Sequence, residues 1–227
     1  YKQLFDTSQL FAAGLLALGT VREEKVGLIS DNRKEWEQSD MGIMMIGACD
    51  VPRGCDASEN DLKYILSFTE VKTCVVENST QIKKIMNVKN DIPTLKQFII
   101  FDQISDEVQS LCDASNVKIY TFQQILDLGK AFTEKNPNRV NEEIEKGQWD
   151  DIAAIIFTSG TTGTPKGVML SHGNFITQLD ELQERIYLYP GDKAICVLPV
   201  WHVFQRLVEY VILSQAASIC YSKPIGS

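Results

Sequence analysis

Several familiar patterns are missing from this sequence of 227 residues, and each absence excludes a class of protein. No two cysteines stand at C-x-x-C spacing and there are only two histidines, which excludes a zinc site built from cysteine and histidine. No apolar run reaches the roughly 18 residues of a membrane-spanning helix, and no signal-peptide pattern is visible. The six cysteines are scattered, and several lie in apolar runs. We therefore expect a cytoplasmic protein with reduced cysteines: Cys49, Cys55, Cys74, Cys112, Cys196 and Cys220.

Basic residues are also few. The formal net charge is −8 and the isoelectric point is near 4.9. Nucleic acid is therefore not expected as a partner, because phosphate backbones attract basic surfaces. An acidic protein can still bind an anionic small ligand through one local loop.

What is present is an alternation of apolar strands and helices. Strands are predicted at 25–29, 73–76, 98–101, 194–198 and 217–221, and helices at 33–47, 58–68, 80–89, 121–132, 171–187 and 203–213. An earlier helix carries Leu4, Phe11 and Leu15 on one face and ends near Gly19. This rhythm predicts parallel strands joined by crossover helices, hence an α/β fold with doubly wound, mostly parallel sheets. We expect an N-terminal α/β region at 1–150 and a second region at 151–227.

Local signals refine this prediction. Ser58 with Asp61 three residues later resembles a capping box. The stretch 51–54, Val-Pro-Arg-Gly, predicts a break. Arg206 and Glu209 stand three residues apart on a predicted helix and could pair.

The most informative stretch is 157–167, Phe-Thr-Ser-Gly-Thr-Thr-Gly-Thr-Pro-Lys-Gly. Apolar runs at 152–157 and 168–170 flank it, so we expect a buried strand, a sharp polar loop and a second buried strand. Glycines let the backbone approach a ligand closely, and exposed N–H groups with a lysine form a nest for an anion. The loop therefore predicts a polyphosphate site. It is not a Walker A loop, because Lys166 lies between Pro165 and Gly167 rather than before Ser or Thr.

The stretch 157–167 resembles the signature of the adenylate-forming superfamily, which comprises acyl-CoA synthetases, luciferases and the adenylation domains of peptide synthetases. Residues 198–202, Leu-Pro-Val-Trp-His, resemble the Pro-x-x-His segment of that family. The stretches 11–16, 31–36 and 47–52 resemble its N-terminal region. Within the superfamily, 51–56 and 201–206 look most like long-chain fatty acyl-CoA synthetases.

The resemblance implies ATP-dependent activation of a fatty acid to an acyl-adenylate and then to acyl-CoA, with ATP, Mg²⁺ and coenzyme A. The residues that would wrap the phosphates are Thr158, Ser159, Gly160, Thr161, Thr162 and Gly163. Thr158 would lie nearest the magnesium, and Lys166 would support the loop or the phosphates. His202 would lie near the reacting carboxylate, and Trp201 would line the acyl pocket. The plainer alternatives are a solvated lysine, a packed or surface histidine, and a core tryptophan.

Other family segments are not in this sequence. They are Tyr-Gly-x-Thr-Glu, Tyr-x-Thr-Gly-Asp and the mobile C-terminal domain with its catalytic lysine. We expect an N-terminal fragment that does not form acyl-CoA alone, and detection of acyl-CoA synthesis by the purified chain would contradict this. Two alternatives remain open: a non-catalytic nucleotide-binding homologue, and a ligase for another carboxylic acid. A greasy substrate is compatible with peripheral membrane contact, although no basic amphipathic helix indicates it. The sequence does not address oligomeric state.

Overall fold

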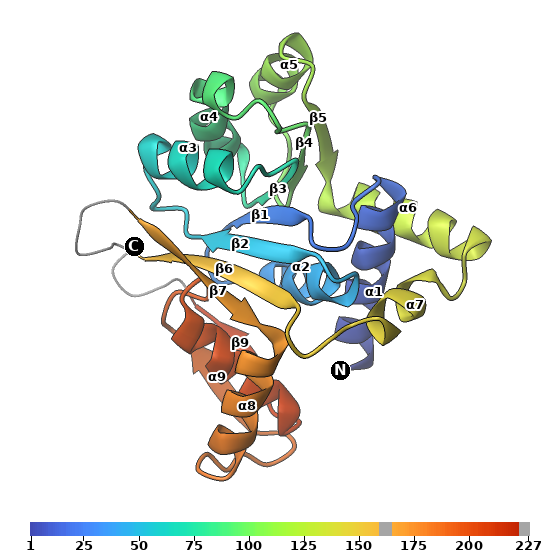
Figure 1. The fold of residues 1–227 in the computed structure, drawn as a ribbon, viewed down its shortest axis with the longest axis vertical. Helices are drawn as coiled ribbons and strands as arrows, with labels where there is room; N and C mark the ends of the chain where they lie inside the picture. The colour runs from blue at the N-terminus through green and yellow to red at the C-terminus, as the bar shows by residue number, and fades with distance from the viewer. Residues whose placement is uncertain (159–164, 223–227) are drawn as a thin grey trace.

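A seven-stranded sheet organises the chain, as a computed structural model shows for residues 1–158 and 165–222 (Figure 1). The strand order is β5-β4-β3-β1-β2-β6-β7. The strands are β1 (Lys25–Ile29), β2 (Cys49–Arg53), β3 (Thr73–Val76), β4 (Gln97–Ile100), β5 (Lys118–Thr121), β6 (Ile152–Thr158) and β7 (Lys166–Ser171). All neighbours pair in parallel except β6 and β7, which are antiparallel. The α/β fold with a mostly parallel sheet is thereby confirmed.

Helices cover both faces of this sheet. One face packs against α1 (Lys2–Ala17), α2 (Lys34–Met45), α6 (Phe122–Lys135) and α7 (Arg139–Glu145). The other packs against α3 (Glu59–Phe68), α4 (Ser79–Asn87) and α5 (Asp106–Ala114), with a short 3₁₀ turn at Lys89–Asp91. Because the central strands are covered on both sides, a strand such as β3, Thr-Cys-Val-Val, is buried along its whole length.

A smaller unit follows β7. It contains α8 (His172–Gln183), α9 (Val203–Ser214) and a parallel pair of strands, β8 (Lys193–Cys196) and β9 (Ser218–Tyr221). In Figure 1 these elements lie together below the large sheet. None of the helices in the described ranges is long and apolar enough to cross a membrane.

Side-chain caps define several helix starts. Ser58 and Asp61 form the predicted capping box at α3, and Thr121 forms another with Gln124 at α6. Gly19 ends the first helical segment with a φ of +88°, a conformation that favours glycine.

Two expectations about the strands fail. The predicted break at 51–54 is wrong, because β2 continues through Pro52 to Arg53. The Arg53 carbonyl accepts from Ser30 beside it, so the nitrogen of Pro52 faces the β6 side, where only Asp50 pairs. The second flanking strand is not buried. β7 is an outermost strand of the sheet, and its Val168 and Met169 are 44% and 65% exposed. Strand β5 and helix α5 were not predicted.

Candidate functional site at the sheet edge

The carboxyl ends of β1, β2 and β6 form one edge of the sheet, where open α/β sheets bind their ligands. Asp50 pairs with Ala154, so equal steps along the parallel strands bring Arg53 and Phe157 to the same level. The chain leaves β6 at Thr158 and returns at Lys166, directly opposite in the antiparallel register. The predicted phosphate-binding residues between them, 159–163, lie outside the described residues.

Packing fixes where β6 ends. The ring of Phe157 meets Tyr64 and Phe68 of α3 edge-on, each with 6.1 Å between ring centroids. A side chain at Gly167 would come within 2.9 Å of Ile155, so glycine lets the returning strand lie close. Thr158 and Lys166 are both exposed.

The loop before α9 is held at the same edge. The amide of Asn32, just after β1, donates to the Leu198 carbonyl at 2.8 Å and accepts from the Val200 N–H at 2.8 Å. Trp201 lies against Arg53, whose guanidinium carbon is 4.8 Å from the ring centroid. His202 is exposed and caps α9, and its Nδ1 accepts from the Phe204 N–H at 3.3 Å.

A buried ionic cluster anchors α9 one turn after His202. Arg206 is fully buried and binds Asp40 of α2 and Asp50 of β2, the latter at 2.9 Å. Its Nε donates to Tyr210 at 2.7 Å, and its guanidinium lies 4.9 Å from the ring of Phe175 in α8. Arg206 therefore joins the smaller unit to the large sheet.

The predicted pair of Arg206 with Glu209 is wrong. Glu209 instead accepts from Cys196 and Gln205, and Tyr221 donates to its other oxygen at 3.2 Å. The two sides of the helix thus serve different partners, because the guanidinium is drawn to the closer carboxylates of α2 and β2.

Carboxyl groups outnumber cations in this cluster. Burial raises the pKa of Asp40 to about 7 even with Arg206 beside it. Burial, followed by the neighbouring charges of Asp40 and Glu209, raises the pKa of Glu37 well above its usual range. Burial also raises the pKa of Asp50 and of Glu209. Burial opposes the charged form of Arg206, but Asp40 and Asp50 outweigh it and raise the pKa of the guanidinium.

One group of carboxylate and thiol side chains has metal-like spacing among the described residues. Asp31, Cys55 and Glu77 follow β1, β2 and β3, with ligand atoms within 4.8 Å of one another. Their carboxylates already accept hydrogen bonds, Asp31 from the Cys55 N–H at 3.1 Å and Glu77 from the Asp31 N–H at 2.9 Å. We read them as a turn-stabilising group.

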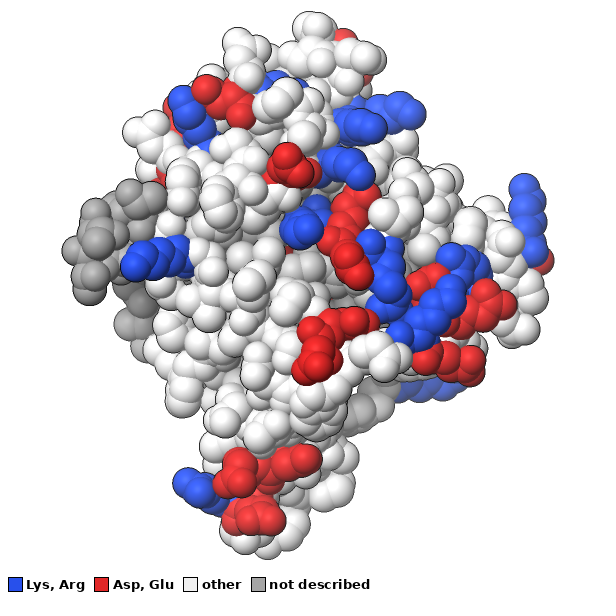
Figure 2. All heavy atoms as spheres, in the orientation of Figure 1, with Lys and Arg blue, Asp and Glu red and all other residues white. Residues whose placement is uncertain are grey.

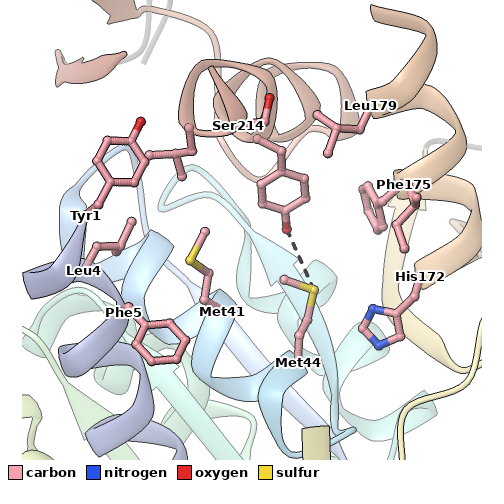
Figure 3. Close-up of a pocket in the computed structure, with 12 residues that line it drawn as sticks. Tyr1, Leu4, Phe5, Met41, Met44, His172, Phe175, Leu179 and Ser214 are labelled. Carbon is pink, nitrogen blue, oxygen red and sulfur yellow. Dashed lines mark hydrogen bonds between the residues drawn. The ribbon is translucent and has the colours of Figure 1, made fainter. Parts of the chain in front are cut away.

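A separate apolar pocket of about 470 Å³ lies between α1, α2, α8 and α9. Figure 3 shows Leu4, Phe5, Met41 and Met44 facing Phe175 and Leu179 across it. His172 also lines it, and burial lowers the pKa of this imidazole. Figure 2 shows few charged side chains between the β7 edge and α8, whereas acidic and basic groups are interspersed elsewhere on this face.

The structure thus brings Thr158, Lys166, Trp201 and His202 to one edge, although about 40 residues separate the two segments. It also shows residues that sequence reasoning missed, chiefly Asn32, Asp40 and Asp50. One signal was available: Asp50 interrupts the apolar stretch 48–51, and an acid inside a buried strand requires a partner.

A family model described as AMP-binding enzyme matches residues 1–226. A chloroplastic long-chain fatty acid–acyl-carrier-protein ligase of Arabidopsis thaliana is 33% identical over 225 residues, which cover 98% of this chain and 31% of that protein. Long-chain fatty acid–CoA ligase 1 of Homo sapiens is 29% identical over 227 residues, covering 96% and 31%. The chain therefore spans less than a third of the length of these relatives.

Solved structures show the same fold. The adenylation domain of a carboxylate reductase from Mycobacterium chelonae superposes with a TM-score of 0.80 at 18% identity, covering 98% of this chain and 35% of that one. An anthranilate–CoA ligase in complex with anthranoyl-AMP gives a TM-score of 0.79 at 20% identity, covering 98% and 39%.

Proposed function

The chain belongs to the AMP-binding enzyme family, and we propose that it supplies the phosphate loop and the acyl-site loop of an ATP-dependent ligase for a long-chain fatty acid. The fatty acid ligases among its relatives support this substrate class. The observation that carries the proposal is the sheet edge that gathers Thr158 and Lys166 with Trp201 and His202. We treat 1–150 and 151–227 as two regions of one catalytic domain.

The chemistry follows from this placement. A carboxylate oxygen of the fatty acid attacks the α-phosphorus of ATP. The bond to the β-phosphate oxygen breaks, and pyrophosphate leaves. A thiol then attacks the acyl carbon and releases AMP. Both steps need neutralised phosphate charge and an aligned nucleophile, which fixed polar groups supply.

Each candidate residue has a part in that alignment. The ammonium of Lys166 and the hydroxyls and N–H groups of 158–163 would hold the phosphates. The exposed hydroxyl of Thr158 is a hard oxygen donor, which suits Mg²⁺, so Thr158 would hold that ion while it neutralises phosphate charge. His202 and Trp201 would position the carboxylate and the first part of the acyl chain.

The thiol belongs to coenzyme A in this proposal. The 33%-identical plant relative is named for ligation to acyl-carrier protein, which makes the carrier's thiol the second candidate. Product analysis with each acceptor separates the two.

The test is carboxylate-dependent exchange of pyrophosphate into ATP by the protein expressed from its complete reading frame. We expect exchange with palmitate and little with benzoate or amino acids. Exchange only with an aryl or amino acid, or none with any acid, would contradict the proposal.

Substitution of Lys166 tests the phosphate assignment. Lys166→Ala should lower exchange at least about tenfold, because one positive group aimed at the phosphates is lost. Lys118→Ala is the matched control. Lys118 is also an exposed lysine that begins an outermost strand, but this strand, β5, lies at the opposite side of the sheet from β7. Equal activity of the two variants would remove Lys166 from the site.

A further inference from the structure

Asn32 makes an unusual contact for a residue in a βα turn. Its side-chain amide is half-buried and spans two backbone groups of a loop that lies 166 and 168 residues away. It donates to the Leu198 carbonyl and accepts from the Val200 N–H, both at 2.8 Å. The amide binds the carbonyl of one loop residue and the N–H of the residue two positions later, as the backbone of a neighbouring strand would. It therefore fixes the position of the loop along β1 and the direction in which the loop runs.

A second contact fixes the side chain that follows. The indole of Trp201 lies over the backbone of Gly54, where an added Cβ would be 2.1 Å from the indole Nε1. Arg53 lies against the same ring at 4.8 Å, a distance at which a guanidinium attracts an aromatic face. Only glycine at position 54 leaves space for this placement of Trp201.

These contacts lead directly to His202. The His202 N–H donates to the Pro199 carbonyl at 3.0 Å, and the Leu198 N–H donates to Gln205 at 3.3 Å. The imidazole Nδ1 accepts from the Phe204 N–H. A nitrogen that accepts cannot also carry the proton, so the neutral ring carries its hydrogen on Nε2. The loop therefore sets the position of His202, and the first turn of α9 sets its tautomer.

We propose that Asn32 is a positioning residue for carboxylate activation, acting through the loop that carries Trp201 and His202. This inference rests on the proposed function. Asn32 does not touch substrate. It holds the loop from the β1 side, while Arg206 holds the helix that follows.

The first test is a double-mutant cycle on pyrophosphate exchange in the protein from its complete reading frame. Asn32→Ala should lower kcat/KM for palmitate about tenfold or more while KM for ATP stays within about twofold. In a His202→Ala background, the same substitution should cost less, because only the effect through Trp201 remains. Equal losses in both backgrounds, or a parallel loss in KM for ATP, would overturn the proposal.

Asn87→Ala is the matched control, because the amide of Asn87 also donates a hydrogen bond, at 2.7 Å to Glu59 between α4 and α3. It should leave kcat/KM for palmitate unchanged. If Asn32→Ala does not fold, Gly54→Ala provides the same test, because its Cβ displaces Trp201 from the other side of the loop. It should raise KM for palmitate and spare KM for ATP, and an unchanged KM for palmitate would overturn the role of the loop.

A readout independent of catalysis separates this inference from the proposed function. In the protein from its complete reading frame, His202→Ala identifies the imidazole carbon-bound proton signals of His202, and His172→Ala identifies those of His172. Asn32→Ala should shift the His202 signals and leave those of His172 in place. Unmoved His202 signals would overturn the positioning role even in an active enzyme. Shifted signals in a protein without carboxylate-dependent exchange would support the positioning role and contradict the proposed function.

Discussion

At the scale of single residues, Arg206 is a buried cation that pairs with two buried carboxylates, Asp40 and Asp50. Arg206, Asp40 and Asp50 are each 0% exposed, so none of the three charges is hydrated by solvent. Arg206→Ala would leave two carboxylates buried without a cation, and we expect it to lower the free energy of unfolding by about 3–5 kcal/mol. Urea denaturation measures this. The control is Arg185→Ala, whose pair with Glu181 is exposed on both sides and should change stability by less than about 1 kcal/mol.

A smaller effect than that of Arg185→Ala would show that the cluster is not closed in solution. Replacement by lysine distinguishes charge from geometry. Arg206→Lys keeps the charge but cannot reach both Asp40 and Asp50 with a planar fork, so it should recover only part of the lost stability.

At the scale of elements, α1 and α6 approach each other through glycine. A Cβ on Gly129 would lie 1.9 Å from the Leu10 carbonyl oxygen, and one on Gly14 would lie 2.3 Å from that of Ile125. Gly129→Ala gains up to about 1 kcal/mol of helix propensity, but the backbones would have to separate. We expect a net loss of about 1–3 kcal/mol from overpacking, measured by thermal or urea unfolding.

Lys130→Ala is the control for that prediction. Lys130 is the next residue of α6 and is exposed, so truncation to alanine should leave stability nearly unchanged. If Gly129→Ala were as stable as this control, the two helices would not be held as closely as the structure shows.

Elements differ in how well the sequence predicts them. Caps are local, so the capping box of Ser58 and the start of the helix at 121 were read correctly from a few residues. Pro52 was misread as a break, because its tolerance depends on β6, about 100 residues later, pairing with β2 only at Asp50. Strand β5 was missed because its residues, Lys-Ile-Tyr-Thr, are only partly buried and do not form an apolar run.

At the scale of the whole molecule, what escaped prediction is long-range pairing. The motif 157–167 and the segment 198–202 could be recognised from sequence because their spacing is local. No local sequence pattern pairs Asn32 with Val200, or Arg206 with Asp50, because these partners are 168 and 156 residues apart. Such pairs follow only from the order of strands in the sheet, which brings the two ends of the described chain together.

The buried ionic cluster around Arg206, at the junction of the smaller unit with the large sheet, should make the stability of the whole molecule depend on pH. Four buried carboxyls, those of Glu37, Asp40, Asp50 and Glu209, share one guanidinium, and all four have raised pKa values. Both oxygens of Glu37 are buried, and its carboxyl lies beside that of Glu209, so the pair favours a protonated Glu37. Other titratable groups near Glu37 are Tyr210, Cys196 and Tyr221.

The sign follows from proton binding. A raised pKa means that the folded protein keeps protons which the unfolded chain releases above its usual carboxyl pKa of about 4. Stability should therefore fall as the pH rises above about 4 and continue to fall through the value of about 7 for Asp40. Glu143, whose pKa is lowered by its salt bridges to Lys146 and Arg139 against the effect of burial, acts only below about pH 4.5, outside this window.

Urea midpoints at pH 5.5 and pH 8 test this dependence, because both lie outside the range in which Glu143 titrates. His172, whose pKa is lowered by burial, contributes in the opposite direction in this window, but equally in the wild type and in the variants, so the comparison between them carries the test. Glu37→Gln is the decisive variant, since an amide has the shape of the protonated acid but cannot release a proton. The wild type should lose stability between the two pH values, and Glu37→Gln should lose less. Glu134→Gln, an exposed glutamate on α6, should follow the wild type. If the wild type were more stable at pH 8, or if Glu37→Gln followed it in parallel, the junction would not hold an excess of protons, and the cation of Arg206 would suffice for its carboxylates.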